Sequence, residues 1–351
     1  MTATGRDPSK PAPDAAPALW RSGLATGIGS LPGEDPREAA ELVLGELPVP
    51  HLPELPNRGW LADLAGRGAA LLADLYVDVQ PTGWRMVPRP SRDGRRAKDL
   101  LARDLDAFEL VASASPPEVL KLQATGPWTL ATLIELHRGD KVLADHGAVE
   151  DLAQSLAQGL ADHLADVQRR FPTTTLVLQL DEPSLPAVLL ARVATSSGFA
   201  TLRSPSPLTV RDRLRTALRA AATTTAAGTT AGHTVVHCCA PRPPVDLLVE
   251  AGAGALSLDA AMLDPRDDDV LGAALEHGTG LLLGVVPGTD GDLPAVRDLE
   301  RTVGRLRDRV GMPQVTLTPA CGLAGATPAY ARAAMKRLVE AAGVLAEVAQ
   351  Q

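Results

Sequence analysis

The chain has little of several residue types, and each scarcity excludes a class of protein. Only three of its 351 residues are cysteine, an odd number that makes a poor disulfide framework and favours a reduced, cytoplasmic setting. No uninterrupted apolar run approaches the roughly 18 residues of a membrane span, and the start of the chain lacks the apolar core of a signal peptide. The formal net charge is −8, and the one basic patch is short. Nucleic acid and anionic membranes are therefore not expected as partners.

What the chain does contain is an alternation of short apolar runs with longer helical patterns. Such an alternation is typical of a parallel sheet with helices packed on it. The helical patterns include residues 148–171, 298–310 and 328–349, where apolar residues recur at spacings of three and four. The expected strands are 24–29, 47–52, 119–125, 175–180, 233–239, 254–259, 280–286 and 314–319.

Eight strands are the number that closes a (β/α)8 barrel, also called a TIM barrel, and the chain length suits this α/β fold. The sequence predicts a single barrel domain over residues 21–351, preceded by a disordered lead-in over residues 1–20. An open doubly wound sheet is the alternative, but no G-x-G-x-x-G follows the first expected strand.

Two segments are expected to lie outside this alternation. Residues 81–96 are predicted to form a hairpin inserted between the second and third strands, with the Arg-rich stretch 92–98 at its solvated tip. Residues 223–232 have low complexity and are predicted to form a loop.

Strong metal-binding side chains stand together after one expected strand, in the sequence HCCAP that begins at His237. Residues two apart on a strand point to the same side, so His237 and Cys239 share a side and Cys238 faces the helices. Cys238 is therefore expected to be a small core residue. The remaining cysteine, Cys321, follows the last expected strand. Because the active site of a barrel lies at the C-terminal ends of its strands, these side chains are expected to meet at one rim.

A histidine and two thiolates, with a fourth position open or weakly held, form a catalytic zinc arrangement. Sulfur ligands favour zinc over magnesium or calcium. Asp259, at the end of the strand 254–259, is a candidate for the fourth position, and a carboxylate that caps the next helix is the equal alternative. The sequence thus predicts a Zn²⁺ site at His237, Cys239 and Cys321, against the alternative that all three cysteines are core residues.

Two acidic residues follow the buried strand 175–180 in the sequence QLDEPSL. Asp181 is the first of them and is predicted to face the pocket as a ligand-binding carboxylate. Glu182 is accounted for by a solvated loop.

Six short motifs in this order resemble the catalytic barrel of cobalamin-independent methionine synthase. The resemblance extends from about residue 24 to about residue 345. The motifs are TGIGSLP at 26–32, TGPWTL at 125–130, QLDEPSL at 179–185, HCC at 237–239, SLD at 257–259 and PACGL at 319–323.

The resemblance implies a zinc-dependent methyltransferase acting on the thiol of homocysteine or of a related small molecule. It implies His237, Cys239 and Cys321 as zinc ligands, and Asp259 stands where the family has a fourth ligand, a glutamate. Zinc deprotonates a bound thiol, which otherwise is only a few per cent thiolate at pH 7. Two thiolates and a neutral histidine leave the site without net charge, so the substrate sulfur stays nucleophilic.

The resemblance also implies a homocysteine site. The backbone around Ile28, Gly29 and Ser30 would bind the amino-acid carboxylate, and Asp181 would bind the ammonium group and so hold the sulfur at the metal. Glu54 is the match to the second acid of that site.

The methyl donor is the part of the reaction for which the sequence departs from the family. The chain is too short for the additional N-terminal barrel that helps to hold a methyl-folate, and the loop 284–294 lacks the histidine thought to act as general acid. Asp290 is the one side chain of that loop expected to replace it, although a loop aspartate is more often a turn residue. Methyl-tetrahydrofolate and a methyl-corrinoid therefore both stay open as donors, the second of which needs no protonation to leave.

Two alternatives to this function are considered. A uroporphyrinogen decarboxylase-like enzyme would have the same barrel and need no zinc, and the H-x-C pair with a distant cysteine argues against it. A non-catalytic zinc- or thiol-binding protein is the other.

Overall fold

The structure of the chain is a computed structural model that describes residues 19–223, 233–311 and 314–349. Its α-helices are α1 Pro36–Glu46, α2 Leu64–Leu71, α3 Arg92–Ala112, α4 Pro127–Leu133, α5 His146–Arg170, α6 Leu185–Leu189, α7 Pro207–Leu218, α8 Val245–Ala251, α9 Asp268–Glu276, α10 Val296–Val310 and α11 Pro328–Ala349. Its strands are β1 Tyr76–Gln80, β2 Gly83–Val87, β3 Val119–Thr125, β4 Ile134–Glu135, β5 Thr175–Asp181, β6 Thr234–Cys238, β7 Ala255–Asp259, β8 Gly280–Val286 and β9 Thr316–Pro319. Short 3₁₀ turns are η1 Pro56–Arg58, η2 Val142–Ala144, η3 Arg219–Thr223, η5 Ala260–Met262 and η6 Pro265–Asp267.

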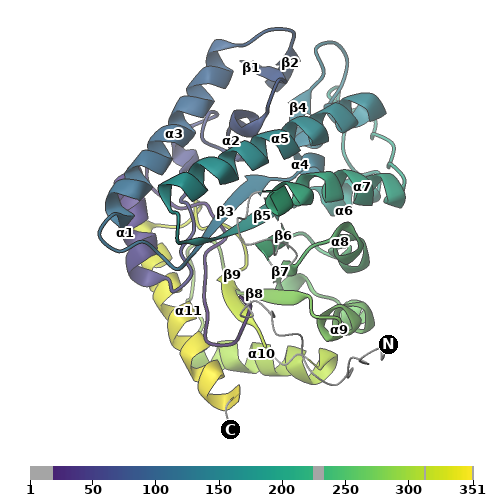
Figure 1. Cartoon of the computed structure of the whole chain (residues 1–351). Coiled ribbons are helices and arrows are strands. Elements are labelled where there is room, and N and C mark those ends of the chain that lie inside the picture. Colours follow the sequence, from purple (N-terminus) through teal and green to yellow (C-terminus); the bar gives the residue numbers. More distant parts are fainter. Residues whose placement is uncertain (1–18, 224–232, 312–313, 350–351) are drawn as a thin grey trace, which may run out of the picture.

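A curled sheet of six parallel strands forms the centre of the molecule, in the order β3-β5-β6-β7-β8-β9. Helices surround its outer side, and the strands lie inside them (Figure 1). These six strands confirm the last six of the eight predicted ones, with ends that agree within two residues. Apolar runs of this kind are typical of strands covered by helices, because both faces of such a strand are buried.

The first two predicted strands, 24–29 and 47–52, are extended segments rather than regular strands in the described structure. Ala25 forms a parallel bridge with Leu317 of β9, and His51 forms one with Lys121 of β3. The two segments therefore lie along opposite edges of the curled sheet. The segment 47–52 contains prolines, which have no N–H group to donate, and this prevents a continuous ladder of hydrogen bonds.

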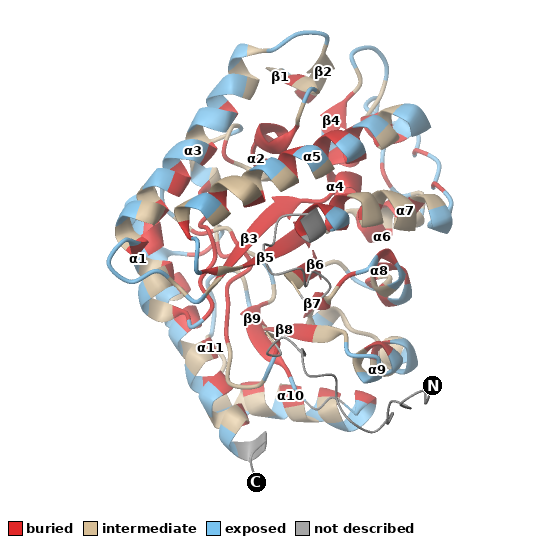
Figure 2. Ribbon diagram, viewed as in Figure 1, coloured by how far each residue is buried: buried red, intermediate tan, exposed pale blue. Residues whose placement is uncertain are grey.

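Side chains of the sheet strands alternate between two sides with different surroundings. Val236 and Cys238 belong to the large core between sheet and helices, whereas Val235 lies in a small separate cluster on the inner side. The strands are almost wholly buried, while the outer faces of the helices are exposed (Figure 2). Inward-facing residues near the C-terminal ends of the strands, in contrast, are largely polar, and they form the site described below.

The small inner cluster includes Trp20, the last residue of the predicted lead-in. This side chain is 9% exposed and packs with Val177, Val235, Ala255 and Leu282. Packed structure therefore begins before residue 21. Residues 1–18 of the predicted lead-in lie outside the described residues, as do residues 224–232 of the predicted loop.

The predicted hairpin is present before β3, but its position was wrong. It is formed by β1 and β2, which pair antiparallel from Tyr76 to Val87, and β2 also pairs with β4. The Arg-rich stretch 92–98 is not a hairpin tip but the beginning of helix α3. The Ser91 hydroxyl accepts a hydrogen bond from the Gly94 N–H at 2.8 Å, which caps this helix and so starts it there.

No helix in the described part of the chain is long and apolar enough to cross a bilayer.

Candidate metal and thiol site

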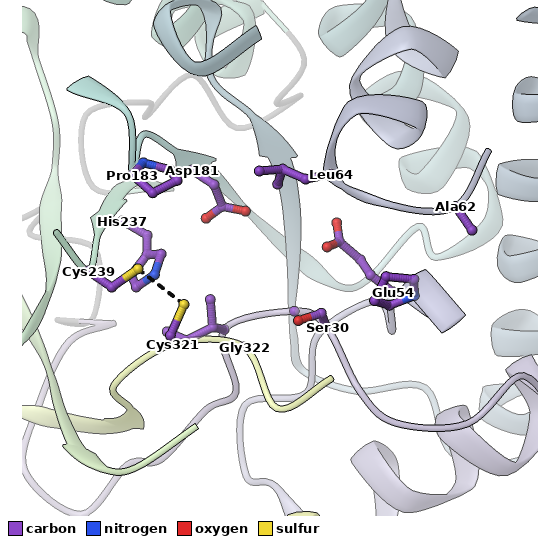
Figure 3. Close-up of a pocket in the computed structure, with 13 residues that line it drawn as sticks. Ser30, Glu54, Ala62, Leu64, Asp181, Pro183, His237, Cys239, Cys321 and Gly322 are labelled. Carbon is purple, nitrogen blue, oxygen red and sulfur yellow. Dashed lines mark hydrogen bonds between the residues drawn. The ribbon is translucent and has the colours of Figure 1, made fainter. Parts of the chain in front are cut away.

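A cavity of about 210 Å³ lies where the C-terminal ends of several sheet strands meet the extended segments (Figure 3). Histidine and cysteine side chains occupy one side of it, and two carboxylates face each other across it. The residues that line it are Ile28, Gly29, Ser30, Glu54, Pro56, Ala62, Leu64, Asp181, Pro183, His237, Cys239, Cys321 and Gly322. All of the predicted substrate-binding residues and three of the four predicted metal ligands are therefore in one place.

The three predicted metal ligands form a compact group. The ligand atoms of His237, Cys239 and Cys321 all lie within 4.8 Å of one another. The His237 side chain is 2% exposed, and its Nδ1 lies 3.1 Å from both the carbonyl oxygen and the hydroxyl of Ser257. Its Nε2 is buried without a hydrogen-bond partner in the described structure. With Nδ1–H donated to the Ser257 carbonyl, Nε2 carries a free lone pair, as in a histidine oriented to bind a metal.

The two site cysteines share a hydrogen bond. Their Sγ atoms are 3.1 Å apart, shown as the dashed line in Figure 3. This bond lowers the pKa of Cys321 to about 4, and the same bond raises the pKa of Cys239. Cys238 differs from both, because it is fully buried in the core between sheet and helices. The alternation of β6 thus separates two adjacent cysteines into one site residue and one core residue, as predicted.

Asp259 is not part of this compact group among the described residues. Its Oδ1 accepts a hydrogen bond from the N–H of Ala261 at 2.9 Å, which caps the short helix η5. The structure thus displays the capping role that the sequence allowed as the alternative to metal binding. Burial raises the pKa of this carboxyl group.

The two carboxylates of the cavity are held by different neighbours. Asp181, at the end of β5, is 6% exposed, and its Oδ1 accepts a hydrogen bond from Gln179 Nε2 at 2.7 Å. Burial raises the pKa of Asp181 to about 7. Glu54 accepts from Arg67 Nε at 3.1 Å. Arg67 in turn pairs with the buried Asp104, so a chain of charged groups reaches from α3 to the cavity wall.

Two residues beneath the cavity were not predicted from the sequence to belong to the site. Lys121 in β3 is fully buried, and its Nζ donates to the carbonyl of Ile28 and to Gln179 Oε1, both at 2.8 Å. Gln179 lies two residues before Asp181 on the same strand. The available signal was a lysine and a glutamine at inward positions of otherwise apolar strands.

The interpretation of Glu182 as part of a solvated loop was wrong. Glu182 is fully buried, and its carboxylate accepts hydrogen bonds from the N–H groups of Trp128 and Thr129 and from the Thr129 hydroxyl. It therefore satisfies the first turn of α4, where N–H groups lack partners within the helix. Burial raises the pKa of Glu182 to about 7.

Asp290, the residue predicted as a general acid, forms its hydrogen bonds outside the cavity. Its Oδ1 accepts hydrogen bonds from the N–H and the hydroxyl of Thr327, each at 3.0 Å, just before α11. Asp290 is exposed and does not line the cavity. This is the turn role that the sequence offered as the alternative to a general acid.

Taken together, a parallel α/β sheet with a histidine and two thiols converging at its strand ends defines an α/β enzyme with a candidate metal centre. The chain belongs to the cobalamin-independent synthase family, since the model of that family's catalytic domain matches residues 24–344. It is thus a methyltransferase of the cobalamin-independent methionine synthase type, and the resemblance seen in its motifs is confirmed. No curated protein matches the chain.

Solved structures share the fold at low sequence identity. A B12-independent methionine synthase from Shewanella sp. W3-18-1, solved in complex with selenomethionine, has a TM-score of 0.59 and 11% identity over 93% of this chain and 98% of its own. A putative vitamin-B12-independent methionine synthase from Listeria monocytogenes has a TM-score of 0.54 and 13% identity over the same shares. A methyltransferase from Methanosarcina mazei has a TM-score of 0.57 and 17% identity over 93% of this chain and 94% of its own.

Proposed function

We propose that this protein is a zinc-dependent methyltransferase that transfers a methyl group to the thiol of homocysteine. The observation that carries the proposal is the position of the His237, Cys239 and Cys321 group on the wall of a cavity that also contains two carboxylates. One part of the cavity suits a soft metal ion and a sulfur atom, and the other suits an ammonium group.

The side chains present fit a zinc ion. Nitrogen and sulfur are the usual zinc ligands, and three protein ligands leave a position for substrate in a catalytic site. The buried Nε2 of His237 has no partner in the described structure, and an unpaired buried nitrogen is unfavourable unless something binds it. Asp259 is proposed to complete the ligand set only if its carboxylate leaves the N–H of Ala261.

Zinc held by these residues would supply the deprotonation of the substrate thiol. The thiolate sulfur then uses a lone pair to form the new bond to the methyl carbon, while the bond from that carbon to the donor breaks and its electron pair leaves with the donor. The chain's own contribution is to hold the sulfur and the methyl group in line and to keep the amino-acid part of the substrate fixed.

The rest of the cavity supports an amino-acid substrate. Asp181 and Glu54 point toward each other across the cavity and are placed to accept hydrogen bonds from an ammonium group between them (Figure 3). The backbone of Ile28, Gly29 and Ser30 offers N–H groups for a carboxylate. A relative from Shewanella was solved with selenomethionine, an analogue of the product of this reaction.

We also propose that the complete architecture is a single (β/α)8 barrel. The extended segments that contain Ala25 and His51 would be its first two strands, since each bridges one edge strand of the six-stranded sheet. A further bridge joins the two segments between Ser30 and Glu54. These bridges would close the ring and hold both substrate-binding segments at its rim.

Metal analysis followed by methyl-transfer assays tests this function. Purified protein should contain about one zinc ion per chain and form methionine from homocysteine with methyl-tetrahydrofolate or a methyl-corrinoid as donor. Zinc with no transfer from either donor would favour a metal- or thiol-binding protein. Transfer at the same rate after complete removal of zinc would contradict the metal's role.

A further inference from the structure

One buried cation lies beneath the cavity without lining it. Lys121 is 0% exposed, and its side chain ends among groups of the sheet interior. An ammonium group only donates hydrogen bonds, and burying it is costly unless acceptors surround it. Its two acceptors are the carbonyl oxygen of Ile28 and the Oε1 of Gln179, each 2.8 Å from Nζ. Each acceptor is connected to a different part of the proposed substrate site.

The first acceptor fixes a backbone amide of the cavity wall. The carbonyl of Ile28 accepts from Lys121 and also from Gln179 Nε2, at 3.0 Å. In a trans peptide the carbonyl of one residue and the N–H of the next lie in one plane and point in opposite directions. Two donors on the Ile28 oxygen therefore turn the N–H of Gly29 away from Lys121. They also polarise the peptide, which strengthens that N–H as a donor.

The second acceptor fixes a carboxylate. Because Lys121 can only donate, the amide of Gln179 must present its oxygen to Lys121. The NH₂ group of Gln179 then faces Ile28 and Asp181, and it donates to Asp181 Oδ1 at 2.7 Å. This hydrogen bond uses one oxygen of Asp181 and leaves the other for the cavity, which Asp181 lines (Figure 3).

The charges around Lys121 support this arrangement. Burial lowers the pKa of Lys121 to about 8, and the nearby carboxylates of Asp181 and Glu54 oppose that shift. The cation and the acids therefore lie within electrostatic reach of one another.

We propose that Lys121 is a positioning residue that makes the cavity prefer a thiol with both an α-ammonium and an α-carboxylate group over a simple alkyl thiol. It does so by holding Gly29 and Asp181, the two recognition groups, through separate hydrogen bonds. This inference rests on the proposed function, because it concerns how the same site selects its substrate.

Calorimetry with three thiols tests the inference. The thiols are homocysteine, 4-sulfanylbutanoate, which lacks the amino group, and 3-sulfanylpropan-1-amine, which lacks the carboxylate. In zinc-loaded Lys121→Met, the preference for homocysteine over both analogues should fall by about tenfold to a hundredfold, the range expected for lost charged hydrogen bonds. Each preference is a ratio of two affinities in one preparation, so partial unfolding of a variant does not alter it.

A second variant tests the connection to Asp181, and it keeps the inference testable if Lys121→Met does not fold. Gln179→Leu removes the link to Asp181 and one of the two donors to the Ile28 carbonyl, but it keeps the hydrogen bond from Lys121 to that carbonyl. It should therefore lose preference mainly against the analogue without an amino group. Lys98→Met is the matched control, because Lys98 also donates to a backbone carbonyl, that of Leu72 at 3.2 Å, but away from this cavity.

The outcomes are distinguishable. Wild-type preferences retained in Gln179→Leu and in folded Lys121→Met, both with a full complement of zinc, would overturn the inference alone. Wild-type protein that binds all three thiols equally would overturn the proposed homocysteine specificity and the inference with it. A fall in thermal stability of Lys121→Met with unchanged preferences would leave Lys121 a purely structural residue.

Discussion

Side-chain direction along one strand decides which of two adjacent cysteines belongs to the site. His237 and Cys239 line the cavity, and Cys238 between them packs in the core. The three residues differ in position by one step each, yet a strand turns successive side chains to opposite faces. A thiol facing the helices cannot reach a metal held on the inner side of the sheet.

Zinc content should therefore depend on two of the three cysteines. Cys239→Ser and Cys321→Ser should each lose most of the bound zinc, because a serine hydroxyl is a poor replacement for a thiolate ligand. Cys238→Ser should retain about one zinc ion per chain, although burying a hydroxyl in the core will lower its stability. Metal analysis of the three purified variants is the measurement. Loss of zinc only in Cys238→Ser would mean that this strand points the other way.

Asp181 should matter for substrate and not for metal. Asp181→Asn should keep its zinc but bind homocysteine more weakly by roughly 2–5 kcal/mol, since it leaves an ammonium group unpaired in a desolvated pocket. Calorimetric titration with homocysteine measures the change. Asp264→Asn is the matched control, because Asp264 caps the turn η6 and pairs with Arg266 but does not line the cavity. Equal affinities in wild type and Asp181→Asn would remove Asp181 from the binding site.

Two neighbouring strand–helix connections depend on each other through a contact between two of the sequence motifs. Glu182 follows β5, and its buried carboxylate holds the first N–H groups of α4, the helix that follows β3. Gly126 precedes that helix, and a Cβ atom placed there would lie 2.4 Å from Glu182 Oε1. The TGPW and DEP motifs are thus two sides of one contact between neighbouring strand–helix connections.

A substitution at Gly126 should accordingly destabilise the protein. Gly126→Ala forces the Glu182 carboxylate away from α4, and overpacking of this kind typically costs about 1–3 kcal/mol. Gly45→Ala is the control, since Gly45 lies in helix α1 with nothing within 4 Å of the added Cβ. That change should stabilise the helix by roughly 0.5–1 kcal/mol. Urea unfolding of both variants measures the difference, and equal stabilities would show that the rim relaxes around the new methyl group.

For the molecule as a whole, the open question is which methyl donor the cavity serves. A folate nitrogen leaves poorly unless it is protonated, whereas a corrinoid leaves as Co(I) without a proton. General acid catalysis is worth about 10²–10⁴-fold. Asp290 is the residue of the loop 284–294 that was predicted to act as the general acid. It is hydrogen-bonded to Thr327 and lies outside the cavity lining.

We therefore expect a methyl-corrinoid to be the better donor. Values of kcat/KM for methyl-corrinoid should exceed those for methyl-tetrahydrofolate, and Asp290→Asn should leave their ratio unchanged. A steady-state comparison of wild type and variant with both donors is the test. Fast folate turnover in both proteins would show that the proton comes from elsewhere, and a selective loss of folate turnover in Asp290→Asn would restore Asp290 as the acid.

The sheet strands and several site residues could be predicted from the sequence, because they depend on local sequence patterns. The apolar runs fixed the six sheet strands within two residues, and the H-x-C spacing with strand alternation selected His237 and Cys239. Cys321 and Asp181 followed, because residues at the ends of parallel strands share one edge of a sheet. Short motifs in a fixed order then indicated the family.

Some residues have hydrogen-bond partners in distant segments of the chain, and only the tertiary structure decided the roles of these residues. Glu182, which follows Asp181 in a polar stretch, is buried because α4 supplies N–H groups to its carboxylate. Lys121 and Gln179 gain their roles from the carbonyl of Ile28, more than 90 residues away along the chain. Asp290 accepts its hydrogen bonds from Thr327, which lies 37 residues further along the chain. A local pattern states which face a side chain occupies, but hydrogen bonds and burial are set by whichever groups the fold brings against it.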